Sequence, residues 1–112
     1  MSAQPDALLA ELYQTLLQRR GADPKTSYVA QLCAGGSDRI LKKVAEEAGE
    51  VLIAAKNDDD AELVHELADL WFHTMVLMVQ RDLPLETLTN ELAGRMNRSG
   101  LEEKAARKRV KD

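Results

Sequence analysis

Apolar residues recur at three- and four-residue spacing along nearly the whole chain, and no segment alternates apolar and polar residues as a half-buried strand would. This periodicity predicts an all-α fold. Glycine, proline and clustered aspartate interrupt the pattern and separate the predicted helices. The expected helical segments are 5–20, a short one over 27–33, 37–57, 59–80, 82–97 and a basic one over 101–112. Because the connections are short, we expect neighbouring helices to run antiparallel in a bundle of about four to five helices.

Side chains that can cap a helix stand at or just before the start of four of these segments. The candidate caps are Ser27, Ser37, Asp59 and Ser99. Their short side chains carry an oxygen that can accept a hydrogen bond from the first turn of a helix. Asp59 and Ser99 are each followed three residues later by glutamate, which is the spacing of a capping box. The four positions therefore predict helix starts.

Size and composition limit the class of protein. A chain of 112 residues is expected to form one domain, residues 1–112. Its 15 basic and 19 acidic residues, a net charge of −4, argue against a general nucleic-acid binder. The longest apolar run, residues 70–79, is too short to span a bilayer. A lone cysteine and an N-terminus without a signal-peptide pattern make the cytoplasm the expected location, with no membrane partner.

The segment over residues 37–57 has two different faces when each residue is advanced by about 100° around a helix. One face is apolar and is expected to pack the core: Ile40, Leu41, Val44, Ala45, Ala48, Val51, Leu52 and Ala55. The opposite face is polar: Arg39, Lys43, Glu46, Glu47, Glu50 and Asn57. Glutamates three or four residues apart on a helix repel each other by a few tenths of a kcal/mol, roughly. Their crowding therefore indicates either screening by water or a bound cation.

The segment over residues 59–80 is apolar around most of its circumference, which is typical of a buried helix. It nevertheless carries one polar stripe, made of Glu62, His65, Glu66, Asp69 and His73. Antiparallel packing of the two long helices would bring together Glu47, Glu50, Glu66 and Asp69. Hard oxygen ligands in that number suit Mg²⁺ or Mn²⁺. A solvated acidic face remains an equal alternative on helical geometry alone. His65 and His73 are interpreted as satisfied polar side chains or outer partners of a site rather than ligands.

These residues also form a recognisable motif. Glu46-Glu47-Ala48-Gly49-Glu50, followed after 15 residues by Glu66-Leu67-Ala68-Asp69, resembles the EExxE…ExxD signature of the all-α nucleoside triphosphate pyrophosphatase superfamily. The similarity extends to SYVAQLCAGGSDRILKKVAEEAGEVLIAAKN, to ELADLWFHTMVLMVQRDL and to SGLEEKAAR. With these segments, roughly residues 7 to 107 resemble the phosphoribosyl-ATP pyrophosphatase family.

The resemblance implies hydrolysis of phosphoribosyl-ATP to phosphoribosyl-AMP and pyrophosphate, the second step of histidine biosynthesis. It implies Mg²⁺ as cofactor, with Mn²⁺ as a possible substitute, and a homodimer that completes the helical bundle. By position in the motif, the principal metal ligands would be Glu47, Glu50, Glu66 and Asp69. Glu46 would be a further ligand or the group that orients the attacking water.

Other polar residues are candidates for binding the substrate. They are Arg39, Lys43, Lys56 and Asn57, with Ser27 and Tyr28 as possible contacts to ribose or base. Lys43 lies one helical turn and Arg39 two turns before Glu47, so they can meet phosphate oxygens or simply pair with nearby glutamates. Both interpretations are open, and a helix cap explains Ser27 equally well.

Three alternative functions remain. The nearest is a house-cleaning pyrophosphatase for ordinary or damaged nucleoside triphosphates. A helical dimerisation module without chemistry would explain the apolar segment over 59–80 but not the converging carboxylates. A di-iron carboxylate bundle is more remote, because it needs two Glu-x-x-His motifs and the sequence has one, from Glu62 to His65.

Overall fold

The structure is a computed structural model that describes residues 5–96 and 100–111. Six helices occupy most of these residues: α1 (Pro5–Arg20), α2 (Tyr28–Ala34), α3 (Ser37–Lys56), α4 (Asp60–Gln80), α5 (Leu85–Met96) and α6 (Gly100–Lys111). No residue in the described ranges lies in a strand. The all-α prediction is confirmed.

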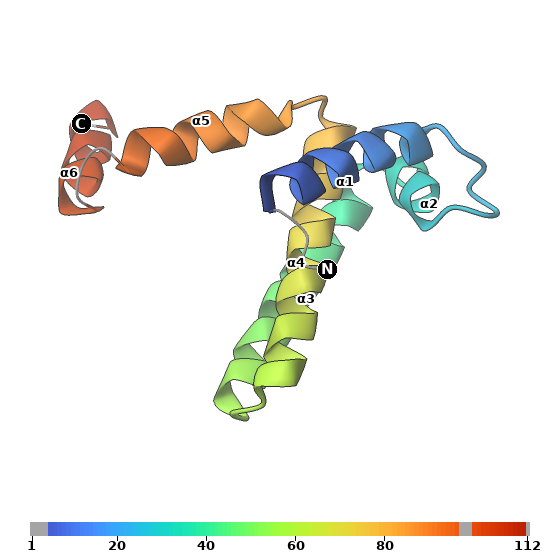
Figure 1. Cartoon of the computed structure of the whole chain (residues 1–112), viewed down its shortest axis with the longest axis horizontal. Coiled ribbons are helices and arrows are strands. Elements are labelled where there is room, and N and C mark those ends of the chain that lie inside the picture. Colours follow the sequence, from blue (N-terminus) through green and yellow to red (C-terminus); the bar gives the residue numbers. More distant parts are fainter. Residues whose placement is uncertain (1–4, 97–99, 112) are drawn as a thin grey trace.

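Helices α3 and α4 form a long antiparallel hairpin, and α1 lies across the end of the hairpin where α4 finishes (Figure 1). Helix α2 packs beside α1 at the same end (Figure 1). Apolar side chains from all four helices meet there and form the core: Tyr13, Leu16, Val29, Leu32, Ile40, Met75, Val76 and Val79. The core therefore holds one end of the α3–α4 hairpin, while the middle of the hairpin is held mainly by the two helices themselves.

Polar contacts fasten α1 to the end of α4. The guanidinium Nη1 of Arg20 donates to the carbonyl oxygen of Val79 at 2.7 Å and to Oδ1 of Asp82 at 2.6 Å. The hydroxyl of Tyr13 donates to the carbonyl oxygen of Leu83. These bonds satisfy carbonyl groups in the last turn of α4 and just after it, where a helix leaves its carbonyls without intrahelical partners.

Two of the predicted caps are confirmed and one is wrong. Ser27 accepts a hydrogen bond from the backbone nitrogen of Ala30 at 3.2 Å, and Asp59 accepts one from that of Glu62 at 3.1 Å. Ser37 is instead the first residue of α3, and Gly36 occupies the capping position with φ 83° and ψ 175°. That backbone conformation is essentially restricted to glycine, so the chain enters the helix one residue earlier than a serine cap would require. The cap predicted at Ser99 lies outside the described residues.

The predicted core face of α3 is wrong for most of its length. Ile40 and Val44 do pack in or against the core, but Leu41, Ala45, Ala48, Leu52 and Ala55 are exposed, Leu52 to 68%. The side of α3 that packs against α4 carries Glu47 and Ala54 instead, both buried. One partner helix can cover only part of so broad an apolar face, and α4 covers the edge next to the glutamates.

Further apolar surface is uncovered elsewhere in the chain. Helix α4 was expected to be buried on most sides, yet Val64, Leu67 and Trp71 are exposed, Trp71 to 56%. Helix α5 contains no buried residue and projects away from α1–α4, with α6 beyond it (Figure 1). None of the described helices is long and apolar enough to cross a membrane. The uncovered faces of α3, α4 and α5 are thus apolar surfaces that the single chain leaves in water.

Candidate metal centre

The two long helices bring three carboxylates together. Glu47 and Glu50 lie one turn apart on α3, and Glu66 reaches them from α4. One ligand atom from each of these three side chains lies within 4.8 Å of the other two. The structure thus places three of the four predicted ligands in one cluster.

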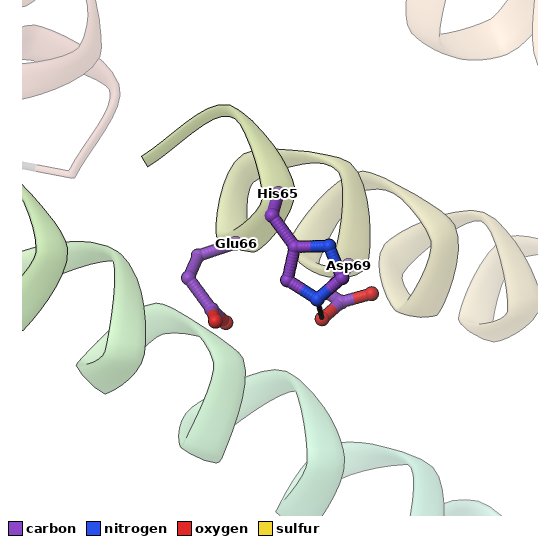
Figure 2. A group of neighbouring side chains, drawn as sticks. All are labelled: His65, Glu66 and Asp69. Carbon is purple, nitrogen blue, oxygen red and sulfur yellow. Dashed lines mark ion pairs between the residues drawn. The ribbon is translucent and has the colours of Figure 1, made fainter. Parts of the chain in front are cut away.

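The fourth predicted ligand, Asp69, belongs to an adjoining group. Figure 2 shows Glu66 extending towards α3 while His65 and Asp69 face each other on α4. Ligand atoms of His65, Glu66 and Asp69 lie within 4.8 Å of one another, and Nε2 of His65 is 3.5 Å from Oδ2 of Asp69. Glu66 is therefore the member shared by the two groups.

Two of the carboxylates are buried with an unpaired oxygen. Glu47 is 5% exposed and Glu66 is 7% exposed. In each, Oε2 has no hydrogen-bond partner among the described residues. An unpaired buried carboxylate is energetically expensive, and either a proton or a cation relieves the penalty. The donor set therefore fits a divalent cation that prefers oxygen ligands.

The protonation of Glu66 reflects the same crowding. Hydrogen bonding to Glu50 and Glu62, together with desolvation, raises the pKa of Glu66 to about 8. Like charges this close cannot all remain ionised, so one carboxyl group keeps its proton. Without a cation, Glu66 holds a proton near neutral pH.

Lys43 pairs with two of the glutamates on its own helix. Its Nζ lies 3.5 Å from Oε2 of Glu46 and 3.5 Å from Oε1 of Glu47. The neighbouring Tyr28 first, and then Glu46 and Glu47, raise the pKa of Lys43, so its ammonium group stays charged. Glu46 is exposed and belongs to neither carboxylate group. Arg39 is exposed too, and it makes no ion pair with any residue that the structure describes.

A cavity of 380 Å³ opens beside the carboxylates. Its walls are Glu50, Ile53, Ala54, Asn57, Glu62 and Glu66. This lining places Asn57 at the site, whereas Lys56 is exposed and does not line the cavity. Glu62 was assigned no role in the site from the sequence. Its position four residues before Glu66, one turn away on the same stripe, is the signal that could have identified it.

His73 links the backbone at Asp69 to the side chain of Tyr28. It is buried, its Nδ1 lies 2.7 Å from the carbonyl oxygen of Asp69, and its Nε2 lies 2.8 Å from the hydroxyl oxygen of Tyr28. A carbonyl can only accept, so Nδ1 donates to Asp69 and Nε2 accepts from Tyr28. Both ring nitrogens are satisfied in the neutral ring. This arrangement agrees with the interpretation of His73 as a satisfied polar residue.

Fold and site together define a helical carboxylate protein, in which two antiparallel helices bury acidic side chains suited to a divalent cation. Residues 9–96 match the family model described as phosphoribosyl-ATP pyrophosphohydrolase. The chain belongs to this family.

Curated relatives are similar in sequence to this chain along most of their length. A protein of Neisseria gonorrhoeae named phosphoribosyl-ATP pyrophosphatase is 57% identical over 102 residues, which is 91% of this chain and 95% of the relative. Proteins with the same name from Trichlorobacter lovleyi and Nitrosospira multiformis are 52% and 48% identical, over 90% and 95% of this chain. The aligned segments cover 94% of the Trichlorobacter lovleyi protein and 87% of the Nitrosospira multiformis protein.

Proposed function

We propose that this chain hydrolyses phosphoribosyl-ATP to phosphoribosyl-AMP and pyrophosphate, the second step of histidine biosynthesis, with Mg²⁺ as the cofactor and Mn²⁺ as a substitute. The observation that carries the proposal is the cluster of Glu47, Glu50 and Glu66 in a chain from a pyrophosphohydrolase family. Membership of a hydrolase family leaves the dimerisation module and the di-iron bundle without support. The cytoplasm is the proposed location, and residues 1–112 are proposed to act as a single domain.

The four proposed metal ligands are Glu47, Glu50, Glu66 and Asp69. Their oxygens are of the hard type that Mg²⁺ prefers, and two of them, on Glu47 and Glu66, are buried without a partner in the described residues. A divalent cation bound there would neutralise phosphate charge and lower the pKa of the attacking water. The net negative charge of the site is then no obstacle to an anionic substrate.

The remaining polar side chains are proposed to bind and orient the reactants. Glu46, exposed beside Glu47, is positioned to orient water or to serve as a further ligand. Lys43 sits between Glu46 and Glu47 and can turn its charge towards a phosphate without leaving the site. Asn57 can donate to the substrate within the cavity that it lines with Glu50 and Glu66. Arg39 and Lys56 are proposed as outer contacts to phosphate oxygens.

The active form is proposed to be a homodimer. Leu52 and Ile53 on α3, Val64 and Trp71 on α4, and most of α5 expose apolar side chains in the single chain. Large apolar side chains exposed in this number favour an interaction site. A second copy of the chain offers matching surfaces, because a two-fold dimer pairs a patch with itself.

Pyrophosphate release tests the proposal. Wild-type protein is supplied with phosphoribosyl-ATP, with ATP and with a panel of other nucleoside triphosphates, each with Mg²⁺ and with excess chelator. We expect strong preference for phosphoribosyl-ATP and loss of turnover with the chelator. Equal or faster turnover of a simple triphosphate would move the chain to the house-cleaning group, and turnover unaffected by the chelator would contradict the metal centre.

A further inference from the structure

A second pocket lies on the α1 side of the hairpin. It has a volume of 390 Å³ and is lined by Arg19, Thr26, Ser27, Tyr28, Val29 and Phe72. None of these residues lines the cavity at the carboxylates. The end of α1, the loop before α2, the start of α2 and one side of α4 thus converge on a separate polar and aromatic pocket.

Arg19 supplies the pocket with positive charge. It is exposed in the last turn of α1 and makes no ion pair or hydrogen bond with any side chain in the described part of the protein. Its neighbour Arg20, by contrast, is bound to Val79 and Asp82. A guanidinium group has several donors in a planar fork, which matches the oxygens of a phosphate. Arg19 is therefore available to an anionic ligand.

Aromatic rings form one wall of the pocket. The rings of Tyr28 and Phe72 lie 19° from parallel with their centres 6.4 Å apart, and His73 meets both rings edge-on. Tyr28 is 44% exposed, so part of its ring faces solvent. Flat aromatic surfaces of this kind stack against nucleobases and cover the apolar faces of sugars.

The wall of this pocket is connected to the metal centre by two hydrogen bonds. The hydroxyl of Tyr28 donates to His73 at 2.8 Å, and His73 donates to the backbone oxygen of Asp69 at 2.7 Å. Lys43, which pairs with Glu47, also lies close enough to Tyr28 for the two groups to interact electrostatically. Tyr28 therefore couples the wall of this pocket to the turn of α4 that carries Asp69.

We propose that this pocket binds a sugar phosphate monoester, the phosphoribosyl group of the substrate, with Arg19 as partner of the phosphate and Tyr28 and Phe72 against the sugar or base. The inference rests on the proposed function and deepens it. It assigns to this pocket the discrimination between phosphoribosyl-ATP and ATP, because only phosphoribosyl-ATP carries a second phosphate far from the triphosphate.

Equilibrium binding of two products tests the assignment. Phosphoribosyl-AMP and AMP are titrated, with Mg²⁺, into the wild type, Arg19→Gln and the matched control Lys25→Gln. Lys25 is an exposed cation in the adjoining loop that does not line the pocket. We expect Arg19→Gln to weaken the binding of phosphoribosyl-AMP by roughly 10- to 100-fold. This is the usual range for losing a charged hydrogen bond. AMP binding should stay unchanged, and Lys25→Gln should bind both products as the wild type does.

Several outcomes would overturn the assignment. One is an unchanged ratio of phosphoribosyl-AMP to AMP affinity in Arg19→Gln, and another is equal weakening by Lys25→Gln, which would indicate a general charge effect. Ribose 5-phosphate serves as a third probe. Arg19→Gln could weaken the binding of ribose 5-phosphate alone and leave the ratio of phosphoribosyl-AMP to AMP affinity unchanged. In that case the pocket binds a free sugar phosphate and not the substrate.

Turnover separates this inference from the proposed function. If the wild type does not hydrolyse phosphoribosyl-ATP, the proposed function fails whatever Arg19 does. If the wild type is active and Arg19→Gln has an unchanged KM, only the subsite fails. We expect a raised KM with kcat changed much less, partial recovery in Arg19→Lys, and a wild-type circular dichroism spectrum in both variants.

Discussion

Glu50 on α3 and Glu66 on α4 each place a carboxyl oxygen within 4.8 Å of the other across the antiparallel hairpin. Two carboxylates this close repel each other, and a proton on one of them relieves the repulsion. The pKa of Glu66 is raised to about 8, so this carboxyl group keeps a proton near neutral pH when no cation is bound, and a cation would take the place of that proton. The first three predictions follow from this relationship.

Removing one charged oxygen from the cluster should remove most of the activity. We expect Glu50→Gln and Asp69→Asn each to lower kcat/KM by about 100-fold or more, because each deletes a proposed metal ligand. Pyrophosphate release at saturating Mg²⁺ measures the effect. Glu11→Gln, an exposed acid on α1, is the matched control and should have normal activity. Near-normal turnover by both site variants would remove these residues from the metal centre.

Glu66 should make the metal-free protein less stable as the pH rises. Its pKa is raised from 4.5 to about 8, so between these values the folded protein binds more protons than the unfolded chain and loses stability with increasing pH. Glu66→Gln removes this dependence. We expect its Tm, measured with chelator, to exceed that of the wild type most at pH 8 and least near pH 5. If Glu66→Gln were less stable than the wild type at pH 8, the Glu66 carboxylate would not be repelled by its acidic neighbours in the metal-free protein.

Cation binding should release a proton. Because the pKa of Glu66 is about 8, its carboxyl group is largely protonated at pH 7 and must lose that proton to act as a ligand. We expect about one proton released per site, and an affinity for Mg²⁺ that increases with pH up to about 8. Titration calorimetry in two buffers of different ionisation enthalpy measures the release. Identical heats in both buffers would show that no proton leaves.

A charge on the uncovered face of α3 should separate the subunits. Leu52 is among the most exposed large apolar side chains of α3 in the single chain. In a dimer that covers this face, Leu52→Glu would bury a carboxylate without a partner. Sedimentation analysis should give twice the chain mass of 12.4 kDa for the wild type and a single chain mass for the variant. The control variant Gln18→Glu, on α1, should remain dimeric. A wild-type protein with the mass of one chain at all concentrations would refute the homodimer.

The hydroxyl of Tyr28 should stabilise the fold through His73. Tyr28→Phe removes the donor to Nε2 of the buried ring, and we expect the loss of about 1 kcal/mol in the free energy of unfolding. Denaturant unfolding measures it. A double-mutant cycle with His73→Gln isolates the contribution of the pair. If the two substitutions are additive, the hydrogen bond contributes nothing measurable.

Local patterns predicted a large part of the site. Glu47 and Glu50 are one turn apart on any helix, and so are Glu66 and Asp69, because the spacing depends only on helical geometry. The two helices are joined by a connection of few residues, which forces them to lie antiparallel. The proximity of Glu47, Glu50 and Glu66 therefore follows from local sequence once both helices are recognised.

Other features depend on which surfaces meet. The broad apolar face of α3 was expected in the core, yet α4 covers the edge that carries Glu47 and leaves Leu52 in water. Helical periodicity identifies an apolar face but does not say which part of it a single neighbour covers. The place of Glu62 in the cavity wall is different, because its position one turn before Glu66 on the same helix is a local signal that the sequence already contains.

The sequence by itself determined the helices, two of their caps and the carboxylate pairs on each long helix, because these depend on residues within one or two turns of each other. Only the tertiary structure decided that Glu47 and Glu66 are buried between α3 and α4. It also decided that Tyr28 contacts His73, 45 residues away in sequence, and that Arg19 lines a pocket separate from the carboxylate cavity. These relationships depend on the packing of α1, α2 and α4 against one another. Packing is set by the combined shape of many side chains, which no local spacing encodes.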